Sequence, residues 1–146
     1  MVSQSLFQEV IRNSKRAQSA AKSKQRSVLI VDDDSTILGF IGMALSLDGY
    51  KCVRASNGQE AMKKMARCDP SIIILDIAMP VMDGKDFYRW LRGSGRTEVP
   101  VILMTAGHNG SKTCEELGAQ ACLTKPFELA QLQSYMRKFI KDTGKS

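Results

Sequence analysis

Histidine is almost absent from this sequence, and long apolar runs are missing altogether. The chain of 146 residues has one histidine, His108, and none of its four cysteines shows C-x-x-C spacing. A zinc site is therefore not indicated, and we interpret Cys52, Cys68, Cys114 and Cys122 as free thiols. No apolar stretch approaches the roughly 20 residues that span a bilayer, and no secretory signal is present. We expect a cytoplasmic protein without a membrane partner.

Positive charge is unevenly distributed along the chain. The formal net charge is +6, but residues 1–27 hold six basic residues against one acidic residue, Glu9. The rest of the chain is therefore nearly neutral. A basic leader on a near-neutral body, without a second domain to supply a recognition helix, is a weak basis for DNA recognition. We expect no sequence-specific nucleic-acid partner and no DNA-binding output.

From Ser27 onward, short apolar runs alternate with amphipathic stretches, which is typical of strand–helix units on a parallel sheet. Right-handed crossovers and short loops favour an α/β fold, a flavodoxin-like doubly wound sheet of five parallel strands in the order 2-1-3-4-5. Ligands in such folds bind at the carboxyl ends of the strands, beside the first and third strands. The predicted strands are 28–31, 51–54, 72–75, 99–104 and 121–123, and the predicted helices are 35–48, 58–68, 84–92, 111–117 and 127–141.

Polar residues follow four of the predicted strands. Asp32 and Asp33 follow the first strand, Asp76 the third, Thr105 the fourth and Lys125 the fifth. Crowded carboxylates are costly unless a cation neutralises them, and oxygen ligands suit Mg²⁺. Beside a metal, Asp76 could act as an oxygen nucleophile toward phosphorus, with Lys125 neutralising charge and Thr105 donating a hydrogen bond. The alternative is that the acidic run only caps the following helix.

Four motifs in order resemble the receiver domain of two-component response regulators over about residues 27–140. The runs are VLIVDDDSTI, DIAMPVMDG, ILMTA and CLTKPF. The resemblance implies a phosphoryl acceptor at Asp76 that is served by a histidine kinase or a histidine phosphotransfer protein. It also implies that the protein is a signalling switch rather than an enzyme. Such a switch catalyses only its own Mg²⁺-dependent phosphorylation and dephosphorylation. The switched surface would then be read by a downstream protein.

The resemblance also implies a role for each matching position around the metal. Asp33 and Asp76 would bind Mg²⁺ directly, together with the backbone carbonyl of Ala78. Asp32 would reach the metal through water. Asp34 lies one position beyond the acidic pair, and we leave it outside the metal site.

Thr105 resembles the switch hydroxyl of the family, and Lys125 resembles its phosphate-binding lysine. Pro126 matches a proline that follows a cis peptide bond. Cys122 departs from the pattern, because many receivers carry an aromatic residue at this position. The usual coupling between the site and the signalling surface is therefore in doubt.

The chain divides into a basic N-terminal helix or linker at 1–26, a receiver domain at 27–141 and a flexible C-terminal tail at 142–146. Residues 6, 7, 10 and 11 of the leader form an apolar stripe at helical spacing. One interpretation of the stripe is a frayed helix followed by a linker. The other is a segment that docks on a partner, forms a weak homodimer or is attracted to an acidic surface.

Two other functions fit parts of the sequence. A phosphatase of the haloacid-dehalogenase type would use Asp32 as its nucleophile, because Asp32 opens a D-x-D motif after the first strand. That reading leaves Asp76 without a role. A degenerate receiver would act only as an interaction module and would not respond to a phosphoryl donor.

Overall fold

The computed structural model describes residues 26–96, 98–107 and 110–143. The predicted leader stripe, His108 and residues 144–146 of the predicted tail lie outside these ranges. The strands are β1 (Ser27–Val31), β2 (Lys51–Ala55), β3 (Ile72–Asp76), β4 (Val101–Thr105) and β5 (Ala121–Thr124). The helices are α2 (Ser35–Leu47), α3 (Gly58–Met65), α4 (Gly84–Gly93), α5 (Gly110–Leu117) and α6 (Leu129–Thr143).

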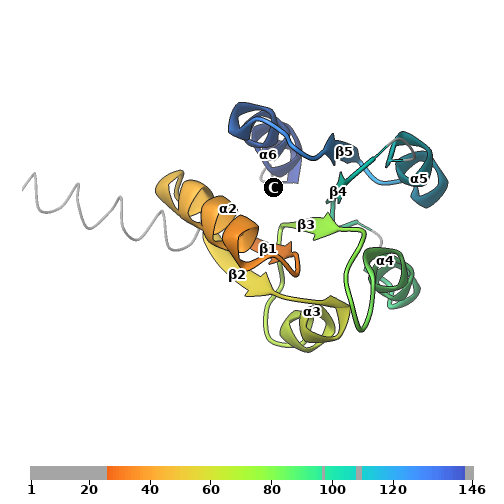
Figure 1. Cartoon of the computed structure of the whole chain (residues 1–146). Coiled ribbons are helices and arrows are strands. Elements are labelled where there is room, and N and C mark those ends of the chain that lie inside the picture. The colour runs from red at the N-terminus through yellow and green to blue at the C-terminus, as the bar shows by residue number, and fades with distance from the viewer. Residues whose placement is uncertain (1–25, 97, 108–109, 144–146) are drawn as a thin grey trace, which may run out of the picture.

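The five strands form one parallel sheet in the order β2-β1-β3-β4-β5, as predicted (Figure 1). β1 pairs with β2 on one side and with β3 on the other. The winding of the chain therefore reverses between β1 and β3. Ligand sites of doubly wound folds lie at the carboxyl ends of the strands beside such a reversal.

Helices cover both faces of the sheet and create two hydrophobic cores. Figure 1 shows α2 and α6 on one face and α3, α4 and α5 on the other. Successive residues of a strand point to opposite faces. Ile74 accordingly packs with the core under α2 and α6, whereas Ile73 packs with the core under α3, α4 and α5. Both side chains are fully buried, and each contributes about 1.5–3 kcal/mol of transfer free energy.

Helix and strand ends differ by a few residues from the prediction. β4 begins at Val101 instead of residue 99, because Pro100 has no N–H to donate to a neighbouring strand. α3 ends at Met65 and not at residue 68, where the chain turns. α2 begins after Asp34, whose carboxylate accepts from the backbone N–H groups of Thr36 and Ile37. The capping alternative is therefore right for this aspartate.

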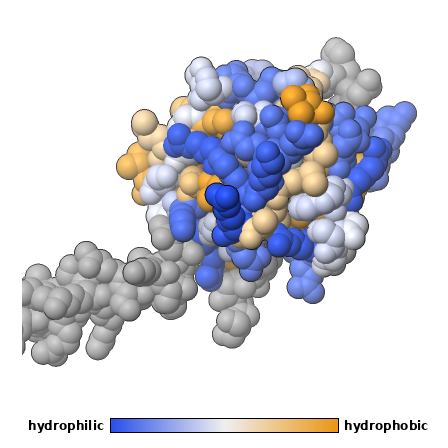
Figure 2. All heavy atoms as spheres, turned by 90° about the horizontal axis from the view of Figure 1, so that it is seen from below, coloured by the Kyte–Doolittle hydropathy of each residue, from blue (hydrophilic) through white to orange (hydrophobic). Residues whose placement is uncertain are grey.

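In the described ranges, no helix combines the length and the apolar character that crossing a bilayer requires. The face drawn in Figure 2 is largely hydrophilic, with hydrophobic residues in small separate areas. The large hydrophobic residues that stay exposed are Phe40, Met43 and Leu47 on α2, and Val81 in the loop after β3.

Candidate functional site

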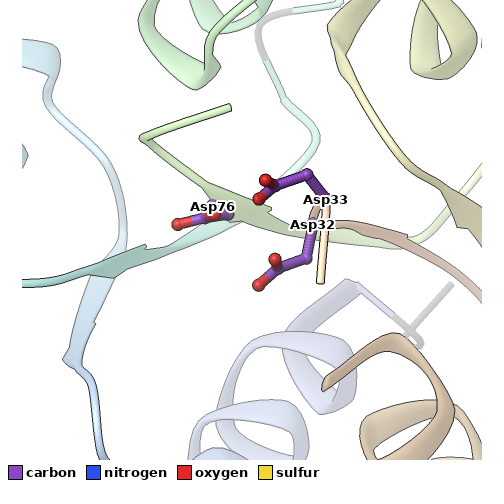
Figure 3. Close-up of side chains that lie close together, drawn as sticks. All are labelled: Asp32, Asp33 and Asp76. Atoms are coloured by element: carbon purple, nitrogen blue, oxygen red, sulfur yellow. The ribbon is translucent and has the colours of Figure 1, made fainter. Parts of the chain in front are cut away.

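Three carboxylates meet where β1 and β3 end. The pairing of Val31 with Leu75 places Asp32 and Asp33, which follow β1, beside Asp76, the last residue of β3. One ligand oxygen from each carboxylate lies within 4.8 Å of the other two. Figure 3 shows the three side chains side by side with their carboxyl groups turned in the same direction.

Lys125 brings a positive charge to these carboxylates from the far edge of the sheet. Its ammonium lies 2.8 Å from an oxygen of Asp32 and 3.3 Å from an oxygen of Asp76. Its backbone N–H donates to the carbonyl of Thr105, which holds the loop after β5 against the end of β4. The peptide bond between Lys125 and Pro126 is cis, as expected.

Burial sets the electrostatics of Asp76. Asp76 is only 5% exposed, and this burial, together with the neighbouring charge of Asp32, raises its pKa to about 6. Lys125 opposes the rise without cancelling it. Burial alone would lower the pKa of Lys125, but its hydrogen bond to Asp32 and the charge of Asp76 raise it. The site thus combines a cationic lysine with a carboxylate that is costly to ionise.

The donor set fits a hard divalent cation. All three clustered groups are carboxylates, and magnesium prefers oxygen ligands from a small number of carboxylates. An added cation would also relieve the mutual repulsion that raises the pKa of Asp76. Asp33 is exposed, so that solvent reaches one side of the cluster.

The loop after Asp76 folds tightly against the end of β3. The N–H of Gly84 donates to the carbonyl of Ile77 at 2.8 Å. A Cβ on Gly84 would overlap the backbone carbonyl oxygen of Asp76, so that only glycine fits there. Val81 adopts a positive φ of 70° at the tip of the loop. Sequence reasoning gave Gly84 no role, although its place at the end of DIAMPVMDG was the available signal.

Thr105 ends β4 and is only 3% exposed. Its hydroxyl lies 4.0 Å from the sulfur of Cys122, the residue at which the sequence departs from the aromatic position of the family. Cys122 is joined to Cys114 by a disulfide. The prediction of four free thiols is therefore wrong for this pair, because α5 packs against β5 and brings the two sulfurs together. It is confirmed for Cys52 and Cys68.

Residues 28–137 match the family described as the response regulator receiver domain. The chain belongs to this family. Response regulator MprA of Mycobacterium tuberculosis is 36% identical over 118 residues, which are 80% of this chain and 51% of the relative. This receiver domain thus spans about half the length of the curated relatives it matches.

Solved structures show the same fold. The signal receiver domain of a histidine kinase from Syntrophus aciditrophicus superimposes with a TM-score of 0.76 and is 31% identical, over 83% of this chain and 94% of that one. The response regulator TrrA of Thermotoga maritima, in complex with Mg²⁺ and BeF, has a TM-score of 0.72 and 28% identity, over 79% of this chain and 99% of that one.

The receiver fold brings most of the predicted site residues together. Asp32, Asp33, Asp76 and Lys125 form one cluster. Thr105 is linked to that cluster through the backbone of Lys125. The metal-binding and acceptor roles assigned to these residues remain predictions, as does the backbone carbonyl of Ala78.

Proposed function

We propose that this receiver domain accepts a phosphoryl group on Asp76 in a reaction that depends on Mg²⁺. The observation that supports the proposal most strongly is the cluster of three carboxylates, two of them buried, beside one ammonium group. Family membership makes phosphoryl acceptance the expected activity of such a cluster. The donor would be a histidine kinase or a histidine phosphotransfer protein.

The reaction is a direct transfer between two proteins. An oxygen of the ionised Asp76 attacks the phosphorus, the bond from phosphorus to the donor nitrogen breaks, and an aspartyl phosphate forms. The nitrogen of the leaving histidine keeps the electron pair of the broken bond. Asp33 and Asp76 would hold Mg²⁺ with the carbonyl of Ala78, while Asp32 would contact the metal through water. A cation held there would neutralise charge on the phosphoryl oxygens.

Two further groups of this chain would stabilise the transferred phosphoryl group. Lys125 already lies 3.3 Å from Asp76, so that its ammonium can move to a phosphoryl oxygen while staying near Asp32. The hydroxyl of Thr105 would donate a hydrogen bond to another oxygen. Asp76 and Thr105 are themselves largely buried, whereas solvent reaches the cluster on the side of Asp33.

The phosphorylated form of the protein would carry the signal. The protein would act as a switch that catalyses only its own phosphorylation and dephosphorylation. We propose that it works in the cytoplasm and that a downstream protein reads the phosphorylated surface. Sequence-specific DNA contact by the receiver domain itself is not part of this proposal.

Intact mass after incubation with acetyl phosphate and Mg²⁺ tests the proposal. The native chain should gain one phosphoryl group, and EDTA or Asp76→Asn should abolish the gain. Asp34→Asn is the matched control, because asparagine caps a helix as well as aspartate and Asp34 already caps α2. A gain that survives Asp76→Asn but not Asp32→Asn would favour the dehalogenase-type nucleophile. No gain in any variant would favour a degenerate interaction module.

A further inference from the structure

The disulfide between Cys114 and Cys122 joins two elements that are close in sequence. Cys114 lies in α5 and Cys122 in β5, eight residues later, with their Cα atoms 6.2 Å apart. Cys114 is buried at 8% exposure, while Cys122 is partly exposed. The bond therefore fixes the middle of α5 to the edge strand of the sheet.

The same cysteine pair contacts the acceptor site through Thr105. The sulfur of Cys122 lies 4.0 Å from the hydroxyl of Thr105 and 3.7 Å from the carbonyl oxygen of Gly110, the first residue of α5. Gly110 itself packs so closely on Thr105 that a Cβ would overlap the threonine hydroxyl. Thr105, Gly110 and Cys122 thus form one packed group, and a shift of any of them displaces the others.

A small cavity of about 110 Å³ borders this group. It separates the loop after Asp76 from the start of α5, and Thr105 stands in its wall. The lining residues are Ile77, Ala78, Thr105, Ala106, Gly110 and Thr113. Thr105 and α5 therefore have space to move toward Asp76 when α5 is not tied to β5.

We propose that Cys114 and Cys122 form a redox-modification site that takes a low-molecular-weight disulfide as oxidant and controls how α5 responds to phosphorylation. The control passes through the contacts of Thr105 and Gly110, so this inference rests on the proposed function of Asp76. In the oxidised protein α5 is held against β5, whereas in the reduced protein α5 can follow Thr105.

The chemistry is ordinary thiol–disulfide exchange. The thiolate of Cys122, the more exposed of the two, attacks one sulfur of the small disulfide and releases the other half as a thiol. The thiolate of Cys114 then attacks the sulfur of Cys122 and releases the second thiol. Two electrons pass from the protein to the oxidant, and the two protons of the cysteines end on the released thiols.

The remaining cysteines provide an internal comparison. Cys52 and Cys68 are free thiols, and burial raises the pKa of each, which lowers its thiolate fraction. Cytoplasmic disulfides are uncommon, and those that occur are usually catalytic or redox-sensing. In the proposed cytoplasmic location, the Cys114–Cys122 bond would accordingly change with the redox state.

The test compares the full chain after treatment with oxidised glutathione and after reduction with a phosphine. Intact mass should show that the oxidised form is lighter by two hydrogen atoms, and peptide mapping should place the bond between Cys114 and Cys122. Each form is then mixed with Mg²⁺ and beryllofluoride, a phosphoryl mimic, and amide exchange is measured across residues 110–119. We expect a change in exchange in the reduced protein and its loss in the oxidised protein.

Two variants sharpen the result. Cys122→Ser should show the beryllofluoride response under both treatments, while the Cys52→Ser, Cys68→Ser double variant should behave as the native chain. Failure to form the bond, or an equal response in both native forms, would overturn the inference. Intact mass after treatment with acetyl phosphate distinguishes these outcomes from failure of the proposed function. If the exchange response is equal in both native forms and both forms gain a phosphoryl group, the proposed function stands and the redox inference falls. If neither form gains a phosphoryl group, both fall.

Discussion

Replacing Asp76 by asparagine should stabilise the protein, and the gain should depend on pH. Asp76 is buried beside Asp32, and both effects raise its pKa from 3.8 to about 6. A carboxyl with a raised folded-state pKa contributes stability below its unfolded-state pKa, and this stability is lost as pH rises through the folded-state value. Asparagine stays neutral at every pH and has nearly the same shape as aspartate. The Asp76→Asn variant therefore avoids this loss of stability.

The magnitude follows from the size of the shift. One pKa unit corresponds to about 1.36 kcal/mol, so that a rise from 3.8 to about 6 corresponds to about 3 kcal/mol of unfolding free energy. In EDTA, Asp76→Asn should therefore match the native chain near its unfolded-state pKa and exceed it by about 3 kcal/mol near pH 8. Mg²⁺ should narrow the difference, because it binds the ionised carboxylates of the folded native chain.

Urea denaturation at a series of pH values, with EDTA and with Mg²⁺, measures both effects. The free energy of unfolding of the native chain, relative to the variant, should fall between about pH 4 and about pH 7 and then level off. Asp34→Asn serves as the control, because Asp34 lies outside the buried cluster and its cap is kept. A difference between Asp76→Asn and the native chain that does not change with pH would refute the reasoning.

Four more outcomes follow from the structure. Lys125→Met should slow the phosphoryl gain at Asp76 by roughly 100-fold in intact-mass time courses, because one charge-stabilising group is lost. At limiting Mg²⁺ the rate of this gain should fall as pH drops below about 6, since only the ionised Asp76 is nucleophilic. Saturating Mg²⁺ should shift the midpoint of this pH dependence to a lower pH. Gly110→Ala should destabilise the fold by about 1–3 kcal/mol in urea titrations, because its Cβ would overlap Thr105. Gly39→Ala, in α2 with open space around it, should instead stabilise by about 0.5–1 kcal/mol.

The sequence predicts the sheet well because its three central strands, β1, β3 and β4, are buried on both faces. The run from Ile72 to Leu75 is wholly apolar, and all of its residues are fully buried in the structure. Parallel pairing and short crossovers then leave few alternatives for strand order. Element ends are harder to predict, because a turn that follows the last helical residue can continue the hydrogen bonding of the helix. α3 ends at Met65, although the backbone N–H of Cys68 still donates to the carbonyl of Lys64.

The cysteine pair could not be predicted from spacing. Cys114 and Cys122 are eight residues apart, and their contact depends on how α5 lies against β5. Only the tertiary arrangement decides whether two such sulfurs meet. Gly84 and Gly110 are a related case, because the sequence does not show that backbone or side-chain atoms lie against them in the folded chain.

Hydrogen bonding explains why Asp76, and not its neighbour Asp32, suits the acceptor role. One oxygen of Asp32 accepts from Lys125 at 2.8 Å, and the other accepts from the backbone N–H of Asp34 at 2.9 Å. Both oxygens of this fully buried carboxylate are thus engaged in structure. Asp76 has the longer contact of 3.3 Å with the same lysine, and its raised pKa shows that its charge is less well compensated. A carboxylate oxygen with fewer donors keeps more of its electron density for an incoming phosphorus atom. Asp32, in turn, is better placed to hold Lys125 than to react, which favours the receiver chemistry over a nucleophile after β1.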